Sequence, residues 1–292
     1  MVTRKKYLAA IALLLPAVLL YSVFVMNPTI QTGYLSLFQW NGIPSVPLKF
    51  VGLKNFTDMF SGIEFWKSLK NSGWFMLIAI LVELPLAFIL ANIITSKIKF
   101  VRFFKVSFFI PVVLPTTAVG IIWTYILYPN GGVVNTILEA VGLGNWALDW
   151  LTNSNTAIIT TALVYGWISA GFTMLIIAAG IVAIPEEIYE CANLDGAAGL
   201  KKFYYITLPM LVETLKICAI LMITDALKVF DIIFVMTKGG PNRLTETPVV
   251  LLYNEAFLYN NFGYGSSVGT FILVAGITIS VLLNKALNRK DY

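Results

Sequence analysis

The sequence predicts an all-α integral membrane protein with six transmembrane helices. Hydrophobic residues make up 58% of its 292 residues and charged residues only 12%, against roughly 45–50% and 25% in soluble globular chains. Apolar runs recur along the whole chain, and each is about long enough to cross the hydrocarbon core of a bilayer, which takes roughly 20 residues. No polar block between them is large enough to fold alone, so residues 1–292 are expected to form a single membrane domain.

The expected spans differ in what interrupts them. Pro111 and Pro115 lie inside the third, where they should kink or break the helix and free backbone carbonyls. Glu83 lies near the middle of the second, where an ionised carboxylate costs about 2.5–3.5 kcal/mol, so it should face the bundle or be neutral. It either lines a pathway or bonds to a neighbouring helix. Small residues at four-residue spacing predict that the last span packs closely against other helices. They are Gly265 with Gly269, and Gly276 with Ser280. The six spans are predicted at about residues 7–26, 73–94, 106–128, 156–183, 209–237 and 264–287.

Basic residues indicate the orientation of these spans. Three of them precede the first run, whose length and lack of a small-residue cleavage site favour a retained span over a signal peptide. Lys and Arg number twelve in the segments assigned to the inner side and six in the outer loops, so both termini are expected in the cytoplasm. The inner groups are Arg4, Lys5, Lys6, Lys97, Lys99, Arg102, Lys105, Lys201, Lys202, Lys285, Arg289 and Lys290.

The fourth and fifth spans carry the polar side chains of a candidate substrate path. From Tyr165 to Phe172, aromatic rings alternate with small residues and a hydroxyl, which suits either a face that stacks on sugar rings or a helix-packing face. Asp225 and Lys228 stand three residues apart near the middle of the fifth span, where charges are costly unless they are paired or hydrated. The candidate path residues are Tyr165, Trp167, Ser169, Phe172, Asp225 and Lys228.

The segment from Ile184 to Pro209 is the longest charged interruption between two apolar runs, yet its pattern is helical. Pro185 suits a first helical position, and two glutamates follow it at the positive end of the helix dipole. Asp195-Gly196 should end this helix before a second one begins. We therefore expect a helix-turn-helix between two spans, with one apolar stripe on each helix. The stripes are Ile188, Cys191 and Ala192, then Ala197, Leu200, Phe203 and Tyr204.

Residues 185–208 with Pro209 also resemble the EAA motif of membrane subunits of binding-protein-dependent ABC importers. The motif reads E-A-A, three residues, G, nine residues, I-x-L-P, and the spacing matches throughout. Cys191 replaces the usual alanine, a small-for-small exchange. In that family the segment is a cytoplasmic coupling helix that docks into a cleft on the ATPase; the alternative is an ordinary amphipathic hairpin that joins two spans. The resemblance implies coupling residues Glu190, Cys191, Ala192, Gly196, Ile206, Leu208 and Pro209.

A second string, from Val229 to Pro241, is similar to the F-D-x-I-x-x-x-T-x-G-G-P string of the sugar-permease branch, in the variety related to the first maltose-type permease. It implies a tight outer turn. The resemblance covers about residues 7–290 and implies the type I permease fold, inward transport of a sugar, oligosaccharide or polyol, and a bacterial or archaeal inner membrane. It also implies three partners: an ATPase dimer, a second related permease in a heterodimer, and an extracytoplasmic solute-binding protein. The turn residues are Thr237, Gly239, Gly240 and Pro241.

Several functional classes are disfavoured by what the sequence lacks. Histidine is absent and there are two cysteines, Cys191 and Cys218, so His-based triads, most zinc sites and a disulfide framework are excluded. No G-x-x-x-x-G-K-[ST] string occurs, so we expect no enzyme activity and no cofactor, with ATP hydrolysis on a separate chain. The net charge of +5 lies at the ends of apolar runs and does not indicate nucleic-acid binding. Two alternatives stay open: a membrane enzyme that uses carboxylates, and an ion-gradient-driven secondary transporter, with Glu83, Asp225 and Asp231 as coupling groups.

Overall fold

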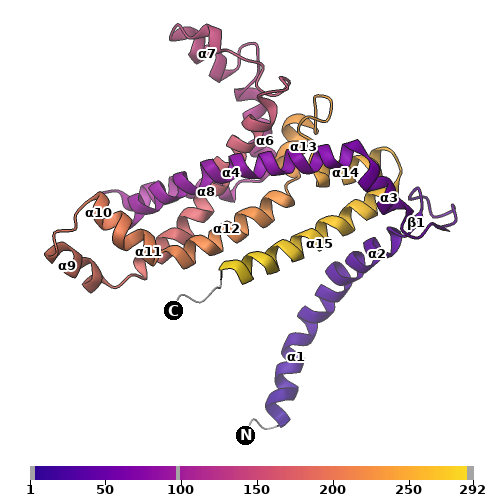
Figure 1. The fold of residues 1–292 in the computed structure, drawn as a ribbon, viewed down its shortest axis with the longest axis horizontal. Coiled ribbons are helices and arrows are strands. Elements are labelled where there is room, and N and C mark those ends of the chain that lie inside the picture. Colours follow the sequence, from indigo (N-terminus) through magenta and orange to yellow (C-terminus); the bar gives the residue numbers. More distant parts are fainter. Residues whose placement is uncertain (1–3, 97–98, 288–292) are drawn as a thin grey trace. The chain divides into compact units, whose positions relative to one another are not determined.

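The computed structural model describes residues 4–96 and 99–287, which are helical for most of their length (Figure 1). Contacts between Cα atoms divide the chain into two compact units, Met1–Phe65 with Leu251–Val274 and Trp66–Val250 with Ala275–Tyr292. The chain passes from one unit to the other inside helices, and a single membrane domain over residues 1–292 stays a prediction. Three of the basic residues expected on the inner side lie outside the described residues: Lys97, Arg289 and Lys290.

In the first unit, one long helical stretch covers the predicted first span and continues beyond it. α1 (Arg4–Tyr21) passes through the π-helical turn η1 (Ser22–Met26) into α2 (Asn27–Leu35). The helix therefore extends beyond the predicted end of the first span at about residue 26. Pro28 falls in the first turn of α2, where its missing N–H costs little, and the wider π turn before it accommodates the ring.

A small sheet and a short helix complete this unit. β1 (Phe38–Gln39) pairs antiparallel with β2 (Lys49–Phe50), and α3 (Lys54–Ser61) follows. The Asn55 amide on α3 donates to the carbonyls of Ser36 and Phe38 at 2.8 and 2.9 Å, which fixes the helix against the turn before β1. The apolar core of the unit consists of Met59, Phe65, Leu251 and Val268, contributed by α3 and by the segments that begin α4, α14 and α15.

The remaining helices are long and apolar or short and amphipathic. Those in or entering the second unit are α4 (Ile63–Thr95), α5 (Val101–Val113), α6 (Thr116–Ile126), α7 (Val133–Ala140), η2 (Gly144–Trp146), α8 (Ala157–Val182), α9 (Glu186–Leu194), α10 (Leu200–Lys202), η3 (Phe203–Thr207), α11 (Leu208–Met210), α12 (Val212–Leu227), α13 (Asp231–Thr237), α14 (Pro248–Tyr253) and α15 (Phe262–Leu287). The π-helical turn η4 (Asn254–Leu258) lies in the first unit.

Up to six membrane crossings fit these helices by length and composition. Among the described residues, four stretches are long and apolar enough alone: Ile11–Leu35, Ile63–Thr95, Ala157–Val182 and Phe262–Lys285. Two pairs of helices joined at a sharp bend bring the number to six when each pair is counted as one span. They are Val101–Val113 with Thr116–Ile126, and Leu200–Met210 with Val212–Leu227. This agrees with the predicted six-helix membrane fold, but two of the predicted spans are not single straight helices.

The third predicted span, residues 106–128, is bent by 97° between α5 and α6. α5 tolerates Pro111 and ends at Val113, and Leu114 then takes an extended conformation with ψ of 143°. This follows from Pro115, whose ring disfavours a helical conformation in the residue before it. The break that the two prolines predicted is therefore confirmed at Pro115.

The fifth predicted span, residues 209–237, is also interrupted. α12 ends at Leu227 and α13 begins at Asp231, so one continuous helix is the wrong expectation. Backbone groups at such an end need other partners, and the Thr247 hydroxyl donates to the carbonyl of Val229 at 3.1 Å. Asp231 suits the first turn of α13 because a carboxylate is favoured at a helix N-terminus. The sequence gives little sign of this break, since neither proline nor glycine lies there.

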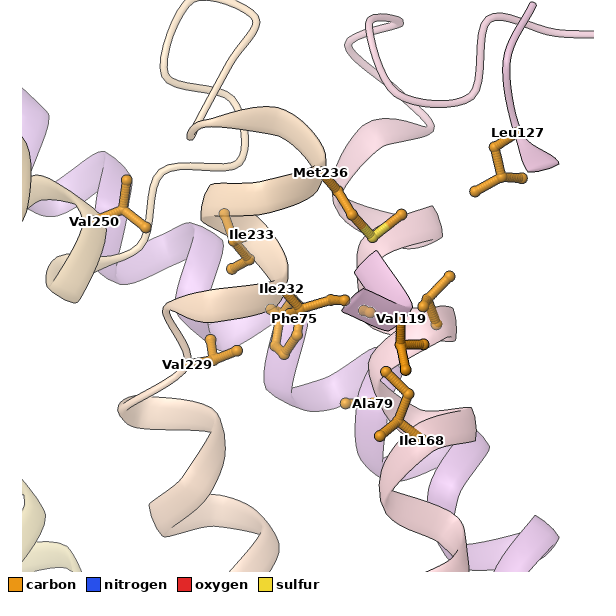
Figure 2. Close-up of a cluster of buried hydrophobic side chains, with 12 residues drawn as sticks. Phe75, Ala79, Val119, Leu127, Ile168, Val229, Ile232, Ile233, Met236 and Val250 are labelled. Atoms are coloured by element: carbon orange, nitrogen blue, oxygen red, sulfur yellow. The ribbon is translucent and has the colours of Figure 1, made fainter. Parts of the chain in front are cut away.

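Helix α8 is the centre of the second unit and packs against α5, α12 and α13. Two of its glycines make this possible: a Cβ at Gly171 would collide with the carbonyl oxygen of Phe108 on α5, and one at Gly180 would lie 2.6 Å from the Thr214 hydroxyl on α12. Figure 2 shows one of the resulting cores, in which α13 packs on α6 and α4. Its labelled members are Phe75, Ala79, Val119, Leu127, Ile168, Val229, Ile232, Ile233, Met236 and Val250.

Small residues on α15 do not all act as predicted. In the first unit, a Cβ at Gly265 would lie 2.9 Å from the Ala256 methyl, and one at Gly269 would lie 3.0 Å from Leu252. Close packing is therefore confirmed for this pair. Gly276 has open space beside its Cα, so its predicted close packing is not made within the described chain.

Candidate functional site

A pocket of about 230 Å³ lies between the helices of the second unit and gathers most of the predicted substrate-path residues. Five helices contribute to its wall. The bend at Pro115 matters here, because it places Thr116, the first residue of α6, in the lining. The wall comprises Glu83 on α4, Val112 on α5, Thr116 on α6, Tyr165, Ile168, Ser169, Phe172 and Thr173 on α8, and Leu221, Met222 and Asp225 on α12.

Helix geometry decides which α8 residues reach this pocket. Tyr165, Ser169 and Phe172 are spaced at i, i+4 and i+7, so they share one face of the helix, and all three line the pocket. Trp167 stands two residues from Tyr165 and lies on another face. It lines a different pocket of about 330 Å³, where its ring meets that of Trp123 at a centroid distance of 5.5 Å. Trp167 therefore does not line the pocket that gathers Tyr165, Ser169 and Phe172.

Glu83 is both buried and part of the pocket wall. Its side chain is 4% exposed, and the Thr173 hydroxyl on α8 donates to its Oε1 at 2.6 Å. This bond joins α4 to α8 across the pocket, and it stabilises an acceptor that would otherwise be costly to bury. The two readings that the sequence left open, pathway residue and interhelical partner, are thus both compatible with its position.

Of Asp225 and Lys228, only Asp225 lines the pocket. Asp225 lies in the last turn of α12, is exposed, and lines the pocket. Lys228 is the residue that ends this helix; its backbone N–H donates to the Asp225 carbonyl at 3.0 Å, and its side chain lies outside the pocket lining. Their predicted mid-helix position is wrong because α12 stops at Leu227.

The predicted helix-turn-helix is present, and its first helix ends in a hydrogen-bonded cap that explains the motif glycine. Gly196 has φ of +75°, a left-handed conformation that glycine adopts without strain. Its N–H donates to the carbonyl of Asn193 at 3.1 Å, and the N–H of Ala197 donates to that of Ala192 at 2.9 Å. These two bonds form a Schellman cap, which satisfies carbonyls that the helix leaves unpaired. The break at Asp195-Gly196 is therefore confirmed.

The hairpin keeps one side against the second unit and leaves the other open. Ala192 is 5% exposed and Ile188 packs on the core that includes Ile184 and Leu211, but Cys191 is exposed, so the first stripe is narrower than predicted. In the second predicted stripe, Phe203 meets Phe88 at a centroid distance of 5.1 Å. Leu200 is 75% exposed. The remaining motif residues also differ in solvent exposure. Glu190, Gly196 and Pro209 are exposed, and Ile206 and Leu208 are half-buried.

The predicted outer turn forms the start of a loop that is held at several points. Lys238 and Gly239 have φ of +52° and +81°, and the Gly240–Pro241 peptide bond is cis. The Thr237 hydroxyl lies 2.7 Å from the Thr245 hydroxyl, which donates to the Gly240 carbonyl at 2.8 Å. A turn over these residues is therefore present, and its closure involves a threonine that the motif does not include.

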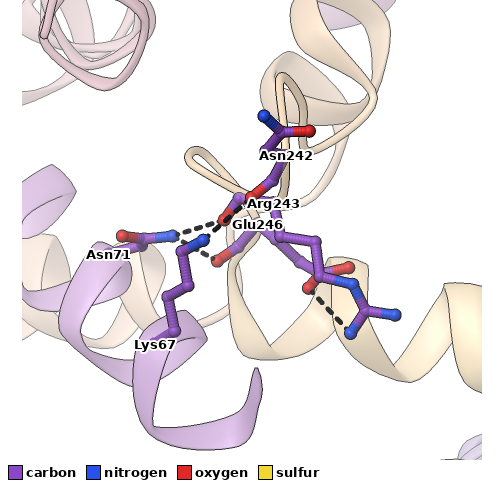
Figure 3. A network of polar contacts seen from close by, with 5 residues as sticks. All are labelled: Lys67, Asn71, Asn242, Arg243 and Glu246. Carbon is purple, nitrogen blue, oxygen red and sulfur yellow. Dashed lines mark hydrogen bonds and ion pairs between the residues drawn. The ribbon is translucent and has the colours of Figure 1, made fainter. Parts of the chain in front are cut away.

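The rest of this loop is bound to the N-terminal half of α4, as Figure 3 shows. Lys67 donates to the carbonyl of Asn242 at 2.8 Å, and Asn71 donates to those of Arg243 and Glu246 at 3.1 Å each. Glu246 is 1% exposed, and its carboxylate lies 3.5 Å from the Arg243 guanidinium. No local pattern in the sequence predicts this network, because Lys67 and Asn71 lie more than 170 positions from the loop residues they bind.

Thr173 and Thr116 were also missed as pocket residues. A signal for Thr173 was available, since it lies four residues after Ser169 and eight after Tyr165 on the same helical face. Thr116 had no comparable signal, because its position depends on the direction in which α6 leaves the bend.

Comparisons with known proteins agree with this architecture. The family model described as "Binding-protein-dependent transport system inner membrane component" matches residues 83–290. The "Probable ABC transporter permease protein YurN" of Bacillus subtilis is 33% identical over 274 residues, which are 93% of this chain and 93% of that protein. The "Trehalose/maltose transport system permease protein MalF" of Thermococcus litoralis is 33% identical over 282 residues, 96% of this chain and 94% of that protein.

A solved structure has the same fold. One chain of a bacterial alginate ABC transporter, crystallised in complex with alginate pentasaccharide-bound periplasmic protein, superposes with a TM-score of 0.84 at 22% sequence identity. The match covers 98% of the chain described here and 96% of that chain. At this identity the likeness establishes the fold.

Proposed function

Because the chain belongs to the family of binding-protein-dependent transport system inner membrane components, we propose that it is the permease subunit of an ATP-driven importer for a carbohydrate. As a multi-pass transport subunit of the inner membrane it is not itself an enzyme. The observation that carries the proposal is the combination of a polar pocket between α4, α6, α8 and α12 with an exposed coupling hairpin on the same unit.

The pocket supports a sugar or polyol as substrate. Sugars offer many hydroxyl groups and apolar ring faces, and they are bound by hydrogen-bonding side chains together with aromatic rings. Tyr165 and Phe172 supply rings, while Ser169, Asp225 and Glu83 supply hydrogen-bonding groups to the same pocket. The relative named for trehalose and maltose transport supports the same substrate class.

The hairpin supports coupling to an ATPase on a separate chain. Glu190 is exposed, and the turn after it is fixed by the Gly196 cap. Exposed apolar side chains on both arms, among them Leu194 at 88% and Leu200 at 75%, offer area that a docked partner would cover. A movement of this hairpin would reach the pocket through α8 and α12, the helices that lead into it on either side.

A second permease subunit is proposed to complete the path. In the most apolar segment of Ile11–Leu35 no residue is buried, and in that of Phe262–Lys285 11% of the residues are buried. These helices therefore have faces left for lipid or a partner. Pro241 and the residues before it resemble the form found in one of two paired sugar permeases. We therefore propose a heterodimer of related permeases, an ATPase dimer and an extracytoplasmic solute-binding protein, in a bacterial or archaeal cytoplasmic membrane.

Reconstitution tests this assignment. The chain is expected to insert into membranes when expressed alone, but to form an active importer only with a second permease, the ATPase and the binding protein. In proteoliposomes, sugar uptake should require ATP and should stop when the nucleotide site of the ATPase is disabled. Uptake that persists without ATP and follows an ion gradient would contradict the proposal, and an active complex with two identical permease copies would contradict the heterodimer alone.

A further inference from the structure

The proposed substrate pocket carries two carboxylates, and none of the described residues that line it is cationic. Glu83 comes from α4 and Asp225 from α12, so the two acids reach the pocket from different helices. The other polar atoms of the wall are the hydroxyls of Thr116, Tyr165 and Ser169, together with that of Thr173, which is already bonded to Glu83. The pocket therefore offers negative charge and hydroxyl groups to whatever occupies it.

The positive charge nearest these acids acts from outside the pocket lining. Lys228 is three residues from Asp225 and interacts with its carboxylate, but its side chain is not among those that line the pocket. The N-terminus of α6 begins at Thr116 and contributes a partial charge of about +0.5. An anionic sugar entering the pocket would lose its hydration without gaining a cationic partner among the described lining residues, and it would approach carboxylates. An uncharged sugar would instead donate hydrogen bonds from its hydroxyl groups to the same carboxylate oxygens.

We propose that Glu83 and Asp225 make this permease selective for uncharged sugars or polyols against their anionic counterparts, such as uronic acids. The inference rests on the proposed function, since it assumes that substrate passes through this pocket. It assigns a specificity role to Glu83, whose bond from Thr173 holds the carboxylate in the wall.

The test uses the complete importer in proteoliposomes, supplied with a panel of neutral mono-, di- and trisaccharides and with their C6-carboxylate derivatives at equal concentration. Uptake of each sugar is measured by mass spectrometry for the wild type, Glu83→Gln and Asp225→Asn. Glutamine keeps an oxygen that can accept the bond from Thr173, so the helix contact is preserved. The same binding protein delivers the sugars in every assay, so its own preference cancels when variants are compared.

We expect Asp225→Asn to raise the ratio of carboxylate to neutral uptake by at least about fivefold, because a repulsive charge has been removed, and Glu83→Gln to raise it by less, because burial disfavours the ionised form of that carboxyl. Glu64→Gln is the matched control: it removes a carboxylate from the exposed first turn of the same helix, away from the pocket, and should leave the ratio within about twofold. If one pocket variant assembles into the importer but transports no sugar, the ratio of carboxylate to neutral uptake in the other variant tests the selectivity proposal. An unchanged ratio in the active variants overturns the selectivity proposal, while uptake of neutral sugars still supports the proposed function. A wild-type importer that transports none of the sugars in the panel contradicts the proposed function itself.

Discussion

Replacing Gly171 with alanine is expected to destabilise the contact between α8 and α5. The added Cβ would collide with the carbonyl oxygen of Phe108 and would lie 2.8 Å from Cγ2 of Val112. Normal van der Waals contact needs about 3.5–4.0 Å, so the helices must separate by roughly 1 Å. A backbone carbonyl within a helix cannot move aside as a side chain can. Overpacking of this kind costs about 1–3 kcal/mol, and here we expect the upper half of that range.

Alanine also has a higher helix propensity than glycine, by about 1 kcal/mol. The net loss of unfolding free energy is therefore about 1–2 kcal/mol, which lowers the midpoint of thermal unfolding by roughly 2–8 °C for a chain of this size. Gly276→Ala is the matched control. No atom lies within 4 Å of the Cβ it would add, so only the propensity gain applies and its midpoint should stay equal or rise.

Cys218 provides the readout. It is 1% exposed and packs in the core that α12 forms with Ala170 and Met174 of α8, so it should react with a fluorescent maleimide only when this core opens. The exposed Cys191 would react at once, and it is first replaced by alanine, the residue that is usual at its position in the motif. Thermal unfolding of the purified chain in detergent is then followed by dye emission. A Gly171→Ala midpoint equal to or above that of Gly276→Ala would refute the reasoning.

Three further predictions follow from the site. Glu190→Lys should leave membrane insertion intact but lower ATPase assembly or ATP-driven uptake more than about tenfold, because the charge at the proposed docking surface is reversed; normal stimulated ATP hydrolysis would contradict this. Asp225→Ala should lower uptake about tenfold or more through lost bonds to substrate, with ATP hydrolysis still responsive to the binding protein, whereas Trp167→Ala, in the other pocket, should keep the sugar preference; equal loss in both would place the path elsewhere. Asn71→Ala should increase hydrogen exchange of the outer loop at residues 238–247 by about fivefold or more, because two loop carbonyls lose their donor; unchanged exchange would show that the network in Figure 3 does not hold the loop.

The sequence was most informative where function depends on local pattern. Long apolar runs predicted the membrane helices, because lipid requires every spanning segment to be apolar and internally hydrogen-bonded. Gly196 was placed at a helix end by the motif and by Asp195 before it, and the cap that requires this glycine involves only residues within five positions. The shared face of Tyr165, Ser169 and Phe172 follows from helical periodicity alone.

Sequence reasoning failed where position depends on other parts of the chain. The break after Leu227 has no proline or glycine to mark it, and it is accommodated by a bond from Thr247, which lies beyond the next helix. Trp167 was grouped with its neighbours because they are close in sequence, although the helix turns it to another pocket.

What the sequence determined by itself is the apolar character of the spans, the motif that ends at Pro209 and the residue types available to the pocket. What only the tertiary structure decided is which of those residues meet. Glu83 and Thr173 form one hydrogen bond although ninety positions separate them, and Thr116 joins their pocket because α6 leaves the bend at 97°. Such contacts depend on how closely helices approach and in which direction they leave a break. These are properties of packing between distant segments, and no local pattern encodes them.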